Sequence, residues 1–393
     1  MIQMKKLPLI ASLLFICSVS AQVVQKTMKR LPDTGQTQSF TATFGEDHDY
    51  SINTPAFTDN GNGTITDTIT GLMWQKGDGG ERSFESATAY ADSLQLGGYS
   101  DWRLPLPQEI VSIFNHQKNN PAMDVTFFPS TGAEYWWTSV HQAGDSTKIW
   151  CGNAGGGIGN HLKTETISAG GTKKFHVKLV RDVQIPALVE NHFTDNGDGT
   201  VTDNLSLLMW QKNPPAAALS WEQALSTAEG LNLAGFNDWR LPNIKELFSL
   251  HNPGRTNPAA DPVFGLQSVT KYWSSTSIPG QQGVKAWYLD TRFGITTYDL
   301  KIQTYPVIAV RGPIAITTES ASQINEPKFS AYPNPGNGWK FCGLGNGEEI
   351  VLMSAGGREI FRGRPQDYDF RQLPPGLYFA RNAAGRVLKL EKY

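Results

Sequence analysis

The sequence predicts an α+β protein in which one domain occurs twice and a smaller all-β unit follows. Three observations predict this: a series of motifs recurs in the same order, strand-like segments alternate around turn residues, and the helices expected in each copy begin at capping residues. A pair of helices beside a run of strands is typical of α+β domains. We therefore expect two short helices beside a mostly antiparallel sheet in each copy.

The repeat is read directly from matching blocks. FTDNGNGTITDTITGLMWQK begins at Phe57, and FTDNGDGTVTDNLSLLMWQK begins 136 residues later at Phe193. SDWRLP then recurs as NDWRLP, WWTS as YWSS, and LVRD as AVRG, all in the same order. Two tandem copies of one domain are the simplest explanation. Each residue can then be compared with its counterpart in the other copy.

Hairpin signals open both copies. The stretches 59–63 and 195–199 read DNGNG and DNGDG between segments of alternating polar and apolar residues. Asn-Gly and Asp-Gly pairs accept the positive φ that tight hairpin turns require. An oxygen-rich loop of this kind is also a calcium hypothesis. Its spacing differs from that of an EF-hand loop, and a hairpin turn accounts for all of its residues.

A helix is expected after each hairpin. In copy one Ser83 is the predicted N-cap, and Phe84, Ala87, Ala91 and Leu94 recur at helical spacing. In copy two Ser220 is followed three residues later by Gln223, which forms a capping-box pattern.

A second helix is expected after each WRLP block. Asn243 and Glu246 form another capping-box pattern in copy two. In copy one Pro107 suits the first helical position, and Glu109 suits the first turn, where the helix dipole favours a carboxylate. The rest of copy two reads as strands over 271–276, 286–291, 294–300 and 305–311.

Composition points to an exported protein. The chain has 39 Gly, 11 Trp and a formal net charge of −2, so nothing in it predicts a nucleic-acid partner. Two lysines precede an apolar run and small residues end it, as in a signal peptide over residues 1–21. That run is too short to span a membrane, and we expect no transmembrane segment.

Cysteine and motif content argue against an enzyme. The three cysteines are Cys17, Cys151 and Cys342, of which the first lies in the signal peptide, so no disulfide framework is expected. The sequence contains no G-x-S-x-G elbow, no H-E-x-x-H and no Walker loop. We expect no catalytic residues, no bound metal and no cofactor.

The predicted domain organisation has six parts. They are a signal peptide (1–21), a polar leader (22–56), copy one (57–182), copy two (193–312), a Ser/Thr-rich linker (313–328) and a C-terminal unit (329–393).

Tryptophans supply the first candidate binding residues. Eight of them fall into four matched pairs, 74/210, 102/239, 137/273 and 150/287, which favours a role in core packing. Trp136 is different, because its counterpart is Tyr272 and it neighbours a paired tryptophan. Alternation along a strand points Trp136 away from Trp137. If Trp137 faces inward, Trp136 and Tyr272 face outward and are predicted ligand-binding residues.

Basic residues supply the second candidates. A basic run near the end of copy one contains Lys163, Lys173, Lys174 and Lys178, and copy two lacks it. We name Lys173 and Lys174 as ligand-binding candidates for acidic glycans, with a solvated loop as the alternative. The arginines of the two WRLP blocks are interpreted as structural, paired with Asp101, Asp238 or a backbone carbonyl.

The ordered blocks TDNGDGTVTD, LMWQK, DWRLPNIKELFSL, YWSSTS, AWYLD and VIAVRG resemble the Lcl C-terminal domain family, which is named for a bacterial collagen-like adhesin. The resemblance covers both copies and implies an exported module linked to adhesion and glycosaminoglycan binding. The RLP and WSST blocks also resemble formylglycine-generating enzymes and related bacterial families, which implies a C-type-lectin-like fold for each copy.

Three departures limit what the resemblance implies. Acidic residues outnumber basic ones in each copy, which disfavours glycosaminoglycan binding. The E-P-N, Q-P-D and W-N-D motifs of calcium-dependent lectins are absent from the sequence. Each copy has at most one cysteine, whereas the oxidase chemistry of formylglycine-generating enzymes uses a pair.

The C-terminal unit carries a second resemblance. AYPNP begins at Ala331, GREI at Gly357 and LPPGLYF at Leu373, and a lysine-containing end follows. These blocks resemble a type A sorting domain of type IX secretion, which implies export across the outer membrane. Expected strands at 349–353, 376–381 and 387–390 suit a small Ig-like β-sandwich.

Together these features predict a secreted or cell-surface, non-enzymatic binding or adhesion protein. Its expected partners are an extracellular glycan or protein, and the type IX secretion machinery through residues 329–393. The alternative is a structural or matrix protein whose repeats bind another protein.

Overall fold

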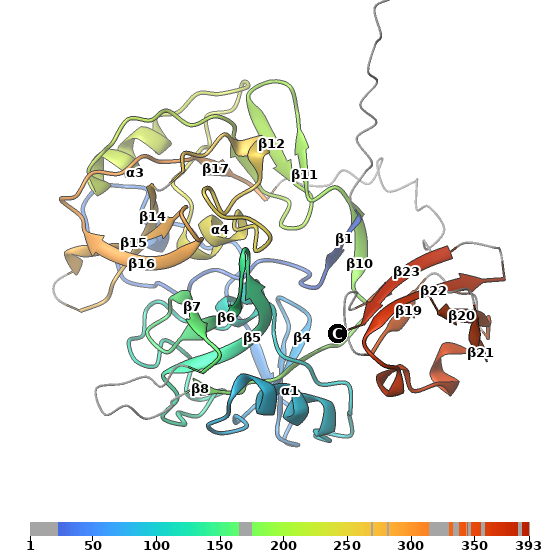
Figure 1. The fold of residues 1–393 in the computed structure, drawn as a ribbon. Helices are drawn as coiled ribbons and strands as arrows, with labels where there is room; N and C mark the ends of the chain where they lie inside the picture. The colour runs from blue at the N-terminus through green and yellow to red at the C-terminus, as the bar shows by residue number, and fades with distance from the viewer. Residues whose placement is uncertain are drawn as a thin grey trace, which may run out of the picture.

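The computed structural model describes residues 23–164, 175–268, 270–280, 283–313, 330–332, 338–342, 344, 347–354, 358–383 and 387–392. The expected signal peptide, nearly all of the expected linker, and both Lys173 and Lys174 lie outside these residues. In Figure 1 the two copies lie against each other, and the C-terminal unit, drawn in red, stands beside them. The fold is largely β-sheet, with few and short helices.

Each copy opens on a four-stranded antiparallel sheet, as the turn signals predicted. In both, the Asn-Gly loop connects the first two strands, and the last strand of the copy returns to pair with the third. The strands are β2 (Phe57–Asp59), β3 (Thr64–Asp67), β4 (Leu72–Gln75) and β9 (Val180–Asp182) in copy one, and β11 (Phe193–Asp195), β12 (Thr200–Asp203), β13 (Met209–Gln211) and β17 (Val310–Arg311) in copy two.

The four predicted helices are present and begin at the predicted residues. They are α1 (Phe84–Ser93), α2 (Pro107–Ser112), α3 (Trp221–Glu229) and α4 (Ile244–Ser249). The Ser83 side chain accepts a hydrogen bond from the amide of Ser86, and Asn243 forms a capping box with Glu246. Among the described residues, no helix has the length and apolar character that a membrane span requires.

A single sheet of seven strands joins the two copies. Its strand order is β14-β15-β16-β7-β6-β5-β8, so β7 of copy one pairs with β16 of copy two at the centre. Only the short β8 runs parallel to its neighbour, β5. The strands are β5 (Tyr135–Gln142), β6 (Asp145–Asn153), β7 (Ile158–Leu162), β8 (Phe175–His176), β14 (Lys271–Ser277), β15 (Lys285–Asp290) and β16 (Ile295–Leu300).

The central pairing places each copy's edge strand against its own counterpart. The ladders match Lys148 with Leu162 in copy one, and Lys285 with Leu300 in copy two. Leu162 of β7 therefore corresponds to Leu300 of β16. Four residues earlier in each strand, Ile158 corresponds to Thr296, and these two residues are paired with each other. A pseudo-two-fold axis therefore passes between them.

Aromatic side chains close the joint between the copies. The Trp150 ring of copy one lies 4.5 Å from the ring of His251, and the Trp287 ring of copy two lies 5.3 Å from that of His116. All four side chains are buried. Burial deprives both histidines of solvation and lowers their pKa to about 3, so the joint contains neutral rings at physiological pH.

The predicted polar leader is built into the fold. Strand β1 (Val23–Lys26) pairs with β10 (Ala187–Glu190), in the segment between the copies. A short 3-10 turn at Asp47–Asp49 packs on β14. Asp47 Oδ2 accepts hydrogen bonds from the hydroxyls of Thr34 and Thr276, each at 2.6 Å, so the polar side chains of the leader meet polar side chains of copy two.

Residues of the C-terminal unit form two further sheets. Strand order in the larger sheet is β21-β20-β22-β23, and β18 pairs with β19. The three strands predicted here are present. The strands are β18 (Ser330–Tyr332), β19 (Lys340–Cys342), β20 (Ile350–Ser354), β21 (Glu359–Gly363), β22 (Gly376–Asn382) and β23 (Val387–Lys392), with 3-10 turns at Pro365–Asp367 and Phe370–Gln372; a further turn, Pro262–Phe264, lies in copy two.

Asp47 makes the stability of the leader joint dependent on pH. Burial raises the pKa of Asp47 from 3.8 to about 7, although its two hydroxyl donors oppose this. The raised pKa stabilises the folded state below pH 3.8, and this contribution is lost as the pH rises through 7. Asp47→Asn removes the titration. We predict that from pH 5 to pH 8 the wild type loses on the order of 2 kcal/mol of unfolding free energy relative to Asp47→Asn.

Urea denaturation at both pH values measures this difference. The exposed Asp198→Asn serves as the control and should leave the pH dependence unchanged. A constant difference between wild type and Asp47→Asn across this range would contradict the assignment.

Candidate functional site

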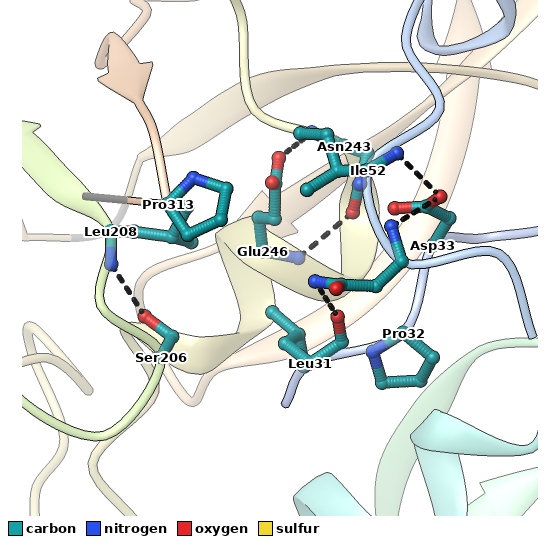
Figure 2. A pocket seen from close by; sticks show the side chains of 10 residues that line it. Leu31, Pro32, Asp33, Ile52, Ser206, Leu208, Asn243, Glu246 and Pro313 are labelled. Atoms are coloured by element: carbon teal, nitrogen blue, oxygen red, sulfur yellow. Dashed lines mark hydrogen bonds between the residues drawn. The ribbon is translucent and has the colours of Figure 1, made fainter. Parts of the chain in front are cut away.

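A small hollow lies where the leader meets copy two. Asp33 accepts hydrogen bonds from the amides of Ile52 and Asn53, and the Asn53 side-chain amide donates to the Leu31 carbonyl. Figure 2 shows Asp33, Ile52 and Leu31 around this hollow. Glu246 caps the helix beside them. The hollow has a volume of about 10 Å³, which is room for one water molecule. It is a structural joint and not a ligand site.

A larger cavity of about 300 Å³ lies in copy one, and we call it the copy-one pocket. This volume is of the size that holds a small ligand. Aromatic and aliphatic side chains make up part of its wall, and hydroxyl, amide, carboxylate and ammonium groups make up the rest. The lining residues are Asn120, Pro121, Met123, Phe128, Pro129, Ser130, Thr131, Gly132, Ala133, Glu134, Trp136 and Lys178.

Three elements position these side chains. The segment that precedes β5 supplies most of the wall, and β5 itself supplies Trp136. Phe128 is anchored from behind, with its ring 5.2 Å from that of Phe57 in an edge-on arrangement. The chain entering β9 supplies Lys178. The aromatic part of the wall is therefore held by the core of copy one.

Lys178 is the charged group at the base of the pocket. Its side chain is 1% exposed, and its ammonium donates hydrogen bonds to the carbonyls of Gln75 (3.3 Å), Lys76 (3.2 Å) and Gly77 (2.5 Å). The same ammonium lies 5.2 Å from the centre of the Phe128 ring. Burial lowers the pKa of Lys178 to about 8, against the opposing attraction of a nearby carboxylate. A buried positive charge at neutral pH therefore remains beside the cavity.

That carboxylate belongs to Asp78, which holds Thr131 in the wall of the pocket. Asp78 accepts a hydrogen bond from the Thr131 hydroxyl and lies 2.9 Å from Nδ1 of His176. Burial alone would raise the pKa of Asp78, but these two hydrogen bonds, a third from the Gly80 amide and the attraction of His176 together hold the pKa below its ordinary value. The rim is thus tied to β8 by an ionised carboxylate.

Copy two differs at three positions in and beside this pocket. Ile308 stands where copy one has Lys178, and Leu266 stands where copy one has Ser130; both are buried in the core. The side chain of Asn213, which replaces Gly77, packs against Gly265, and the backbone N–H of Asn213 donates a hydrogen bond to the carbonyl of Phe264. Copy two therefore has larger or apolar side chains at these three positions.

The outward orientation predicted for Trp136 and Tyr272 is wrong. Trp136 is 4% exposed and Tyr272 is 1% exposed. The prediction assumed a strand with one wet face, but β5 is covered on both. Trp137 stacks on Phe175 at 4.2 Å on one face, and Trp136 meets Phe114 at 6.3 Å on the other. Only Trp136 lines the pocket; the Tyr272 hydroxyl accepts a hydrogen bond from the amide of Gln267.

The other interpretations of the sequence are confirmed in part. All eight matched tryptophans are buried, which confirms their packing role. Arg103 and Arg240 are structural as predicted, but they pair with Glu109 and Glu246 respectively. The predicted partners bind other arginines: Asp101 pairs with Arg181, and Asp238 pairs with Arg311.

The loops considered for calcium are hairpin turns. Asp59 and Asp195 each accept a hydrogen bond from a following amide and pair at 2.5 Å with Lys76 and Lys212 respectively. Within the described ranges, no three histidine, cysteine or acidic side chains are grouped to hold a metal ion. The other candidates, Lys173 and Lys174, lie outside those ranges.

Sequence reasoning missed Ser130 and Thr131, and noted Lys178 only as part of a basic run. One signal was available for Lys178. It interrupts the apolar stretch Val177–Val180, whereas the matching stretch of copy two, Val307–Val310, is apolar throughout. A charged residue that replaces an apolar core residue in just one of the two copies marks a position where the copies differ in function.

The family assignment rests on a match to both copies. The Lcl C-terminal domain model matches residues 63–181 and again 199–311, which together make up more than half of the chain. The chain belongs to the Lcl C-terminal domain family and contains two tandem copies of its domain. No curated protein matches the chain.

Truncating either buried ring should destabilise the fold. Trp136→Ala and Tyr272→Ala each remove a large buried side chain, and we predict a loss of about 3–5 kcal/mol in unfolding free energy for each. Urea denaturation measures it. Ile302→Ala, at a side chain that is 79% exposed, is the control and should change stability by less than about 0.5 kcal/mol. Near-neutral effects at both rings would mean that they are not core residues.

Proposed function

We propose that this chain is a secreted or cell-surface, non-enzymatic binding protein whose copy-one pocket holds one sugar unit of an extracellular glycan. The observation that carries the proposal is the cavity of about 300 Å³ in copy one, together with the apolar core side chains that copy two has at the positions of Lys178 and Ser130. A difference of this kind between two copies of one domain indicates a specialised site.

The lining chemistry supports a sugar as the ligand. Trp136, Phe128 and Met123 offer apolar surface for the C–H face of a sugar ring. Ser130, Thr131 and Asn120 offer hydroxyl and amide groups that match sugar hydroxyls in size and hydrogen-bonding capacity.

The proposed folds extend the same argument. Two helices beside an antiparallel sheet in each copy suit a C-type-lectin-like domain, and the paired sheets of the C-terminal unit suit an Ig-like sandwich. A non-enzymatic role is favoured because neither copy carries a motif of nucleophilic or metal-dependent catalysis.

A second function is a structural or matrix protein whose repeats bind another protein. The continuous seven-stranded sheet favours it, because the sheet makes the two copies one extended body suited to bridging. This function requires no occupant in the copy-one pocket.

A pocket-filling variant separates the two functions. Ser130→Leu introduces the side chain that occupies the matching place in copy two, so it should fold and close the cavity. We predict that the wild type binds at least one class of glycan on an array and that Ser130→Leu binds at least tenfold more weakly.

Ser100→Leu, at an exposed serine outside the pocket, is the matched control and should bind as the wild type does. An array on which the wild type binds no glycan would sink the carbohydrate proposal. Unchanged binding by Ser130→Leu would place the glycan elsewhere.

We further propose that residues 329–393 direct export by type IX secretion. The sequence blocks that resemble a type A sorting domain support this, as does the β-structure of the unit. Export through the periplasm and across the outer membrane would place both copies outside the cell.

Deletion of residues 329–393 should leave the protein in the periplasm, because the two copies retain their own cores and the targeting unit is gone. Fractionation of cells that carry a type IX system, followed by immunoblotting, measures the location. The intact chain is the control, and normal export of the truncated chain would refute the assignment.

A further inference from the structure

The leader is held on copy two by a set of four side chains that we call the leader cradle: Trp221, Thr276, Ser277 and Lys301. The Ser277 hydroxyl donates to Glu46 at 2.5 Å, and the Thr276 hydroxyl donates to Asp47. The ammonium of Lys301 lies 3.7 Å from the centre of the Trp221 ring and is attracted by Glu46. The cradle thus binds two consecutive carboxylates where the leader enters the 3-10 turn Asp47–Asp49.

Copy one has a side chain at each cradle position. On β5, His141 is paired with Ile149, just as Ser277 on β14 is paired with Ala286. His141 therefore corresponds to Ser277, and the preceding Val140 corresponds to Thr276.

The lysine and the aromatic ring also have counterparts. Strand matching places Lys163 at the position of Lys301, one residue beyond the ends of β7 and β16. Each ammonium lies over the first residue of the matching helix: Lys163 is 5.8 Å from the centre of the Phe84 ring in copy one. The ring of His141 lies 5.7 Å from the same phenylalanine. We call Phe84, Val140, His141 and Lys163 the copy-one cradle.

This second cradle is open. His141 is exposed, while Phe84, Val140 and Lys163 are half-buried. Among the described residues, neither the Lys163 ammonium nor the His141 ring makes a hydrogen bond or an ion pair. In copy two, by contrast, Glu46 of the leader neighbours Lys301. Among the residues that the structure describes, the ammonium of Lys163 therefore has an aromatic platform but no carboxylate like the one that accompanies Lys301.

We infer that the copy-one cradle binds an acidic peptide segment of a partner protein. The occupant is inferred from copy two, where the matching side chains hold such a segment, and from the positive charge of Lys163. The differences between the cradles define its sequence. Lys163 and His141 can take the carboxylate that corresponds to Glu46. Val140 offers no hydroxyl, so an apolar residue fits the position of Asp47 better than a second acid.

The probe for this inference is a labelled peptide with the sequence of residues 36–50 and the change Asp47→Leu. Its fluorescence anisotropy is measured against the full chain. We expect saturable binding that weakens about tenfold in Lys163→Glu protein, because the variant sets like charges against each other. A peptide that also carries Glu46→Gln should lose binding to a similar extent. The unchanged 36–50 sequence should bind more weakly than the Asp47→Leu peptide.

Lys148→Glu is the matched control, because Lys148 lies in the same hairpin but is partnered by Asp145; it should bind the peptide as the wild type does. Zero-length carbodiimide cross-linking then locates the peptide carboxylate, and we expect the adduct on Lys163.

Several outcomes would overturn the inference. These are absence of saturable binding, equal affinity of Lys163→Glu, or an adduct on Lys301, which would mean that the peptide displaces the leader. Heparin binding that depends on Lys163, without peptide binding, would assign the cradle to an acidic polysaccharide instead. Ser130→Leu should leave peptide binding intact, so this test is independent of the proposed sugar site.

Discussion

The pairing of β7 with β16 is the interaction on which the arrangement of the two copies depends. Both are edge strands of their own domains, and an unpaired edge strand exposes backbone groups that seek a partner. Each copy supplies a pairing partner for the edge strand of the other, and Ile158 lies opposite its own counterpart Thr296. Trp150 and Trp287 then add buried aromatic contacts across the joint. The two copies therefore form one continuous body through their shared sheet.

Because the copies form one body, they are free to differ. The leader completes copy two, where its buried acids meet hydroxyls of β14. The leader also contacts copy one, where the Thr34 carbonyl accepts a hydrogen bond from the His116 amide. Copy one in addition has the copy-one pocket and the copy-one cradle. Both differences arise from a few replacements at matched positions: Lys178 for Ile308, Ser130 for Leu266, and His141 for Ser277.

Local signals in the sequence predicted the local structure well. Ser83, Asn243 and Pro107 marked helix starts, and the Asn-Gly loops marked hairpins, because capping and turn formation depend on neighbouring residues alone. The orientation of Trp136 was not predictable in this way. Which face of a strand is wet depends on what packs against it, and that is set by residues far along the chain. The roles of Glu46 and Asp47 were not predictable for the same reason, because their partners on β14 lie more than two hundred residues away. The pocket escaped notice because its base is a lysine, a residue type that is seldom buried.

Because the two copies share one sheet, we expect them to unfold together. Differential scanning calorimetry of the full chain tests it most directly, by comparing the calorimetric and van't Hoff enthalpies of the transition that contains both copies. We expect one cooperative transition for copies one and two, separate from any transition of the C-terminal unit. Two resolved transitions, one for each copy, would contradict it.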